Sequence, residues 1–115
     1  MKLYYDPEGD LLEVTFEESL KNVEQRAFRL RDGFMLFVAA DSMRPIHLTI
    51  VNYRRLAELP TFLFNGWKKI KTADRKKLAP ILASSAVSSF LKLDPQTGYG
   101  YVTQSDVLYM LPLAA

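Results

Sequence analysis

The apolar run FMLFVAA at residues 34–40 decides the fold that this sequence predicts. It is the longest uninterrupted apolar run in the chain, and Asp32-Gly33 directly before it is a strong two-residue hairpin signal. A strand that is apolar on both faces lies inside a sheet and is covered on both sides. We therefore expect residues 34–40 to form a central strand, covered by helices or by another subunit.

Further strand signals lie on both sides of this run. Residues 12–17, 28–31 and 46–51 alternate apolar and polar side chains, which is the period of a half-buried strand. The turn sequences DPEGD at 6–10 and DSMRP at 41–45 separate these strands. With a first strand at the N-terminus, residues 2–52 predict an antiparallel meander of about five strands.

The second half carries weaker helix signals. Asn52 is expected to cap a short helix that ends before Pro60, and Thr72 is expected to cap a helix starting near residue 73. Pro80 predicts a kink or a restart in that second helix. The residues expected to share its apolar face are Leu78, Ile81 and Leu82.

The C-terminal part predicts a hairpin. Residues 90–93 and 99–103 flank the turn DPQTG, and residues 107–111 are expected to form another strand or a docking tail. The predicted fold class is α+β. The 115 residues form a single domain, with a β-meander over 1–53 and a mixed helix and hairpin extension over 54–115.

Composition narrows the possible functions. The chain has 49% hydrophobic residues, one His and no Cys, which excludes a disulfide scaffold, a thiol nucleophile and a Cys-ligated metal. No nucleotide-binding, zinc-protease or serine-hydrolase motif is present. No apolar run approaches the ~20 residues that span a bilayer, and no secretory signal is visible. We expect a cytoplasmic protein that is not an enzyme and has no cofactor and no membrane partner.

The N-terminal half resembles the DUF2283 family of small domains. The resemblance rests on YDPEGDLL at residues 5–12, then an alternating strand, a Val-rich strand, an Asp turn and an Ile/Leu strand ending at Tyr53. It covers about residues 1–53 and implies a small β-rich fold of unassigned function. Some members lie near small toxin-like genes, so it also implies an antitoxin-like partner. It implies no catalytic residues, and this chain has Met43-Arg44 where the family usually has Gly.

Two small constellations are candidate sites. The carboxylates of Asp6, Glu8 and Asp10 could hold a hard cation or act as an acid/base pair. The alternative is that Asp6 hydrogen-bonds its own turn while the others are solvated. His47 could act as a general base or a pH switch, or simply pack at a surface or an interface.

A basic segment is the third candidate. Residues 66–77 contain six basic groups and one acidic group, so this segment alone carries a net charge of +5. It could bind phosphate groups or an acidic protein, with Trp67 stacking on a base. Alternatively, it is a solvated helix face with Trp67 and Ile70 anchored in the core. The candidate residues are Trp67, Lys68, Lys69, Lys71, Arg75, Lys76 and Lys77.

Aromatic side chains are the fourth candidate, because they could line a ligand pocket, fill the core or form a subunit interface. They include Phe34, Phe37, Phe62, Phe64, Phe90, Tyr99, Tyr101 and Tyr109. With the apolar run at 34–40, they favour self-association. We expect a protein–protein interaction module that forms a homodimer. The alternatives are a nucleic-acid-associated module that uses the basic segment, and a small-ligand or enzyme domain.

Overall fold

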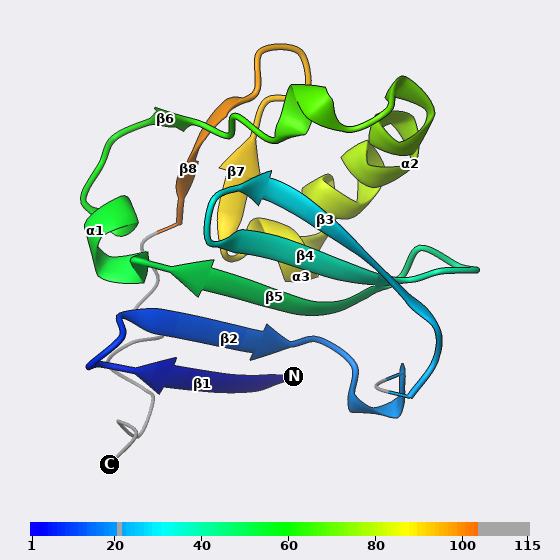
Figure 1. Ribbon diagram of the computed structural model, residues 1–115, viewed down its shortest axis with the longest axis horizontal. Helices are drawn as coiled ribbons and strands as arrows, with labels where there is room; N and C mark the ends of the chain where they lie inside the picture. Colours follow the sequence, from blue (N-terminus) through cyan, green and yellow to red (C-terminus); the bar gives the residue numbers. More distant parts are fainter. Residues whose placement is uncertain (21, 104–115) are drawn as a thin grey trace.

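The computed structural model describes residues 1–20 and 22–103, which form two layers (Figure 1). The first layer is a five-stranded antiparallel sheet, in agreement with the predicted α+β class. Its strands are β1 (Lys2–Asp6), β2 (Leu11–Thr15), β3 (Gln25–Arg31), β4 (Phe34–Ala39) and β5 (Pro45–Val51).

The strand order in this sheet is β1-β2-β5-β4-β3, which differs from a simple meander. After β2 the chain passes through a short 3-10 helix, η1 (Glu18–Leu20), to the far edge, and β5 later fills the middle. The side chains of Ile46, Leu48 and Ile50 on β5 are fully buried, which suits the central position. Strand β3 carries three arginines and therefore suits an edge.

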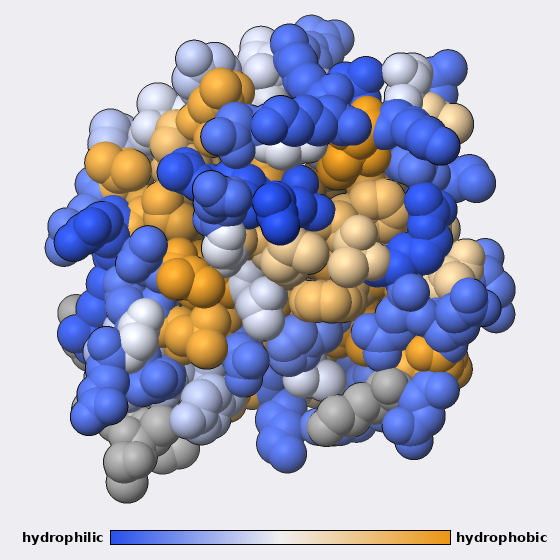
Figure 2. Space-filling view, in the orientation of Figure 1, coloured by the Kyte–Doolittle hydropathy of each residue, from blue (hydrophilic) through white to orange (hydrophobic). Residues whose placement is uncertain are grey.

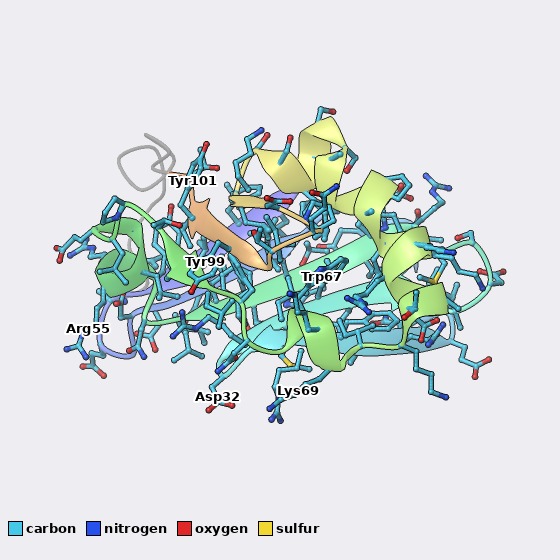
Figure 3. The ribbon with its side chains drawn as sticks, turned by 90° about the horizontal axis from the view of Figure 1, so that it is seen from above. Asp32, Arg55, Trp67, Lys69, Tyr99 and Tyr101 are labelled. Atoms are coloured by element: carbon cyan, nitrogen blue, oxygen red, sulfur yellow. The ribbon has the colours of Figure 1, made fainter. Side chains whose placement is uncertain are left out.

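The second layer covers one face of this sheet (Figures 1 and 3). After α1 (Tyr53–Ala57) it contains β6 (Phe62–Leu63), the 3-10 helix η2 (Trp67–Lys69), α2 (Thr72–Ala83) and α3 (Ser85–Ser88). Strands β7 (Leu91–Leu93) and β8 (Tyr99–Val102) form the predicted hairpin. Strand β6 pairs with β8, which gives a second sheet of order β6-β8-β7. The expected strand or tail at 107–111 lies outside the described residues.

The helix ends differ from the predictions. Helix α2 continues through Pro80 to Ala83 and breaks at Ser84, so the expected restart at Pro80 is wrong. Pro80 has no N–H to donate to the carbonyl of Lys76, so α2 lacks this one hydrogen bond, yet it continues for three more residues. Asn52 does precede α1, but its side chain caps nothing, and Lys71 rather than Thr72 stands at the N-cap of α2.

The core lies between the two layers. The rings of Phe34 and Phe64 meet edge to face with their centroids 5.1 Å apart, which joins β4 to the residue just after β6. The largest fully buried side chains are Trp67, Tyr5, Tyr53, Phe34, Phe64 and Phe90. None of the helices in the described part of the chain has the length and apolar character that crossing a bilayer requires.

The other face of the five-stranded sheet, here called the open face, has none of the described helices or strands over it (Figures 1 and 3). The strand register places its side chains in two rows across the sheet. One row runs Lys2, Thr15, His47, Phe37, Ala27, and the other runs Tyr4, Glu13, Thr49, Met35, Arg29.

Residues 34–40 are expected from the sequence to form a central strand covered by helices or by another subunit. Strand β4 is an inner strand, although β5 and not β4 is the middle one. The second layer covers one of its faces, and cover of the other face by another subunit stays a prediction. Phe34, Leu36 and Val38 point into the core, while Met35 and Phe37 are half-buried on the open face. A continuous apolar run shows that both faces of a strand are apolar, but it does not show whether the same chain covers each face.

Candidate functional site

The acidic turn before β2 builds the fold. The Asp6 carboxylate accepts a 3.0 Å hydrogen bond from the backbone N–H of Glu8, as expected for an aspartate that closes its own turn. Asp10 Oδ1 accepts hydrogen bonds from the Tyr5 hydroxyl at 2.7 Å and from the backbone N–H of Arg54 at 3.0 Å. Asp10 therefore supplies the first turn of α1 with the acceptor that the Asn52 side chain does not provide.

This turn shifts the ionisation of one buried group. Burial in the core and, next in size, the hydrogen bond to Asp10 raise the pKa of Tyr5 to about 12. The carboxylates of Asp6 and Asp10 both already accept hydrogen bonds within the protein. Residues 1–20 and 22–103 contain no group of three or more His, Asp or Glu side chains placed to hold a metal ion.

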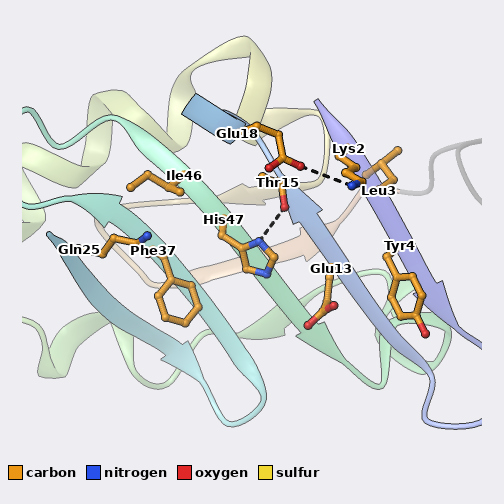
Figure 4. Close-up of a pocket in the computed structure, with 10 residues that line it drawn as sticks. All are labelled: Lys2, Leu3, Tyr4, Glu13, Thr15, Glu18, Gln25, Phe37, Ile46 and His47. Atoms are coloured by element: carbon orange, nitrogen blue, oxygen red, sulfur yellow. Dashed lines mark hydrogen bonds and ion pairs between the residues drawn. The ribbon is translucent and has the colours of Figure 1, made fainter. Parts of the chain in front are cut away.

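His47 lies in a hollow of about 390 Å³ on the open face (Figure 4). Its Nδ1 is 3.1 Å from Thr15 Oγ1, and its ring meets Phe37 edge to face at 5.8 Å. Glu18 and Lys2, on the rim, form an ion pair at 3.7 Å. The residues that line the hollow are Lys2, Leu3, Tyr4, Glu13, Thr15, Glu18, Gln25, Phe37, Ile46 and His47.

Side chains of several chemical types thus meet in this hollow, and of these the sequence indicated only His47 and Phe37. The others escaped notice because single polar residues on alternating strands are ordinary. Only the strand order β1-β2-β5-β4-β3 brings them into adjacent rows.

Trp67 is buried at the start of the basic segment. It is 1% exposed, and its indole Nε1 donates a 2.9 Å hydrogen bond to the carbonyl oxygen of Pro95. A base cannot stack on a ring in this position. The reading of Trp67 as a core residue is therefore confirmed, and Ile70 packs partly buried against the same core.

The cations of the basic segment remain at the surface. Lys68 and Lys69 on η2 are exposed, as are Lys71, Lys76 and Lys77, whereas Arg75 is half-buried. In Figure 3, Lys69 projects from the molecule while Trp67 lies between the layers.

The one acidic residue of the segment, Asp74, accepts two hydrogen bonds from the guanidinium of Arg26 on β3, at 2.8 and 3.1 Å. This contact holds the pKa of Asp74 below its ordinary value, with Lys77 and Lys71 adding to the effect. The pair links the edge of the large sheet to α2, which the sequence did not indicate because 48 residues separate the partners.

A second hollow, here called the β3 groove, lies where the basic segment meets β3. Its volume is about 410 Å³. It collects cations from two distant parts of the sequence, and sequence reasoning missed the two arginines because they belong to a strand. Its lining residues are Arg26, Ala27, Phe28, Arg29, Asp32, Asn65, Gly66, Lys69, Ile70, Lys71 and Asp74.

The aromatic residues divide between core and surface. Phe34, Phe62, Phe64 and Phe90 are core residues, and Phe37 lies half-buried on the open face. Tyr99 and Tyr101 are 52% and 43% exposed on β8 (Figure 3). Tyr109 lies outside the described residues.

No protein-family model matches the chain, and no curated protein and no solved structure is significantly similar to it. The resemblance of residues 1–53 to DUF2283 therefore stays a prediction.

Proposed function

We propose that this protein is a non-enzymatic interaction module that acts as a homodimer, in which the open faces of two copies pack against each other. One observation carries the proposal: the open face has an apolar centre between charges that become complementary when a second copy is laid over it. An antitoxin-like role for such a dimer remains a prediction of the DUF2283 resemblance.

The centre of the open face is apolar. Met35, Phe37 and Ala27 are neighbours on β4 and β3, and Figure 2 shows a pale orange area bordered by blue hydrophilic side chains on this side of the molecule. Burying such a patch against another sheet is favourable, because it removes apolar surface from water. Two sheets that pack face to face lie about 10 Å apart, a gap that their facing side chains fill.

The charges of the open face suit a two-fold arrangement. Glu13 on β2 and Arg29 on β3 belong to the same row, separated by Thr49 and Met35. Three strand spacings of ~4.8 Å hold them about 14 Å apart, too far for an ion pair within one chain. A two-fold axis parallel to the strands, between β5 and β4, would place Glu13 of each copy opposite Arg29 of the other.

The same two-fold axis also determines which other residues of the two copies face each other. It would place Thr49 opposite Met35, and His47 opposite Phe37, so that Met35 and Phe37 lie near the axis while Glu13 and Arg29 lie outside them. An interface with an apolar centre and a polar rim is typical of protein association. A closed two-fold dimer uses this surface completely, so no further copies add to it.

The test is a charge exchange followed by sedimentation equilibrium at several protein concentrations. Glu13→Arg and Arg29→Glu should each weaken the dimer about tenfold, because each places two like charges opposite one another. The double variant Glu13→Arg/Arg29→Glu restores opposite charges and should return the dissociation constant to within about threefold of the original. Failure of the double variant to recover would contradict this arrangement.

A second comparison tests the apolar centre. Phe37→Glu on the open face should give a monomer, because it would bury a charge in the interface. Tyr101→Glu introduces the same charge at an exposed aromatic residue on β8 and should leave the dimer intact. A native protein that sediments as a monomer at about 100 µM would overturn the proposal as a whole.

A further inference from the structure

We infer that the outer edge of β3 and the β3 groove beside it bind an extended, acidic peptide segment of a partner protein, which adds to the sheet as a strand. This inference does not rest on the proposed dimer. It uses the backbone edge of the sheet and the β3 groove, although the side chains of Ala27 and Arg29 also belong to the open face.

The alternation of hydrogen-bonded positions along β3 shows which of its backbone groups point away from β4. The N–H of Ala40 donates to the carbonyl of Glu24 at 2.8 Å. The two residues are one step beyond the last register pair, Gln25 and Ala39, so they extend the same pairing. In an antiparallel pair, hydrogen-bonded positions alternate, so Arg26 and Phe28 bond toward β4. The N–H and C=O of Ala27 therefore point away from the sheet.

Ala27 leaves an open position on this edge. The residue is exposed, and its outward backbone groups have no partner among the residues that the structure describes. Further along the strand the edge is closed, because the N–H of Gly66 donates to the carbonyl of Leu30 at 2.8 Å. A Cβ at position 66 would lie 2.3 Å from the carbonyl oxygen of Arg29, so only glycine allows this close approach.

The groove provides space for an added strand beside Ala27. Phe28 and Ile70 are apolar residues of its lining, and Lys69 and Lys71 line it from the side opposite β3. An added strand lies about 4.8 Å from the edge strand, and its alternate side chains point to opposite faces of the sheet. One set of these side chains would face the core-side layer, and the other would continue the open face.

The charge of the groove selects acidic side chains. Four cations line it, from Arg26, Arg29, Lys69 and Lys71, against two carboxylates, those of Asp32 and Asp74. Arg26 is paired with Asp74, and Arg29 lies 3.6 Å from Asp32. Lys69 and Lys71 therefore give the groove an excess of positive charge beside an open backbone edge.

A peptide fits these features better than a nucleic acid. An extended peptide backbone supplies both an acceptor for the Ala27 N–H and a donor for its carbonyl oxygen, whereas phosphate groups supply acceptors only. Single strands are usually held by aromatic stacking. The one aromatic residue of the lining, Phe28, is buried. The nearby Trp67 is also buried.

The experiment is an amide NMR titration of the full chain with a short peptide of alternating threonine and glutamate. The comparison probes are the matching threonine–lysine peptide and an oligothymidylate of equal negative charge. We expect saturable shifts at Ala27 and around the β3 groove with the acidic peptide alone. No shift at about 2 mM acidic peptide would overturn the inference. Equal shifts of the same amides by the oligothymidylate would replace it with nucleic-acid binding.

Two variant pairs test the mechanism. Ala27→Pro removes the outward N–H but leaves the bonds of Arg26 and Phe28 to β4, a position at which edge strands tolerate proline. It should weaken peptide binding at least about tenfold, whereas Ala27→Val keeps the donor and should change it less than about twofold. Equal affinity of the two variants would contradict strand addition.

The second pair separates the groove from general charge and does not depend on the folding of Ala27→Pro. Lys69→Glu, in the groove, should weaken the peptide about fivefold or more. Lys76→Glu makes the same charge change at an exposed position of α2 outside the groove and should have less than half that effect. Equal weakening by both would overturn a defined site. Glu13→Arg, which targets the proposed dimer from β2, three strands away from β3, should change peptide binding less than about twofold, so the two proposals can fail independently.

Discussion

The Trp67 indole donates its N–H to the carbonyl oxygen of Pro95 at 2.9 Å, which ties η2 to the turn between β7 and β8. The basic segment therefore starts from a fixed point inside the core. Lys68 and Lys69 follow immediately and are exposed, because a three-residue 3-10 helix turns them away from the buried ring. The packing of Trp67 therefore sets the position from which these lysines extend.

Replacing Trp67 by Phe should lower the free energy of unfolding by about 2 kcal/mol. The Pro95 carbonyl would lose its partner, and a smaller ring would fill the site incompletely. Urea denaturation monitored by circular dichroism measures the change. Tyr101→Phe, at an exposed aromatic residue, serves as the control and should stay within about 0.5 kcal/mol of the native protein. An unchanged free energy of unfolding in Trp67→Phe would show that this hydrogen bond is not important for stability.

Replacing Asp10 by Ala should cost about 1–2 kcal/mol, because the Tyr5 hydroxyl and the Arg54 N–H lose a shared acceptor. Asp6→Ala removes a carboxylate from the same turn that accepts one exposed backbone bond, and it should cost less than about 1 kcal/mol. The same urea experiment compares the two variants. Equal losses would contradict the special role of Asp10 in starting α1.

Tyr5 should make the protein less stable at alkaline pH. Its pKa is about 12 in the folded protein and ordinarily 10, so the folded state favours the neutral phenol. This contribution is complete below pH 10 and is lost as the pH rises toward 12. Native protein should therefore lose stability more steeply than Tyr5→Phe over this range. Parallel curves in chemical denaturation against pH would contradict the shifted pKa.

Asp74 should make the protein less stable at acid pH. The hydrogen bonds from Arg26 lower its pKa in the folded state, so its contribution is complete above the ordinary value of 3.8. The contribution is lost as the pH falls through the lower folded value. Asp74→Asn should thus be less stable than the native protein at pH 7, and the difference should shrink below pH 4.

Asp32→Asn is the matched control for this change. The Asp32 carboxylate lies 3.6 Å from Arg29, and both side chains are largely exposed, so this ion pair contributes little. Melting temperatures measured across the acid range compare the two variants. A constant difference between native protein and Asp74→Asn at every pH would rule out an ionic contribution from the pair.

Local signals in the sequence were sufficient for several features. Asp32-Gly33 predicted the β3–β4 hairpin because Gly33 adopts a φ of 74°, which its lack of a Cβ permits. The alternation at residues 46–51 predicted β5 and the buried Leu48. The restart predicted at Pro80 was wrong, because the sequence does not show that Pro80 lies in the last turn of α2. Strand β6 spans two residues, too few to show a period.

The sequence by itself determined the fold class, the strands of the large sheet and the concentration of positive charge in residues 66–77, because these follow from local periodicity, turn chemistry and composition. Only the tertiary structure decided which strands are neighbours, because the crossover after β2 makes β3 an edge and puts β5 in the centre. The edge position of β3 places Arg26 and Arg29 beside Lys69 and Lys71, and the packing of the second layer on one face leaves the other face open. Contacts between residues 40 or more positions apart depend on how the layers pack together, which no local pattern encodes.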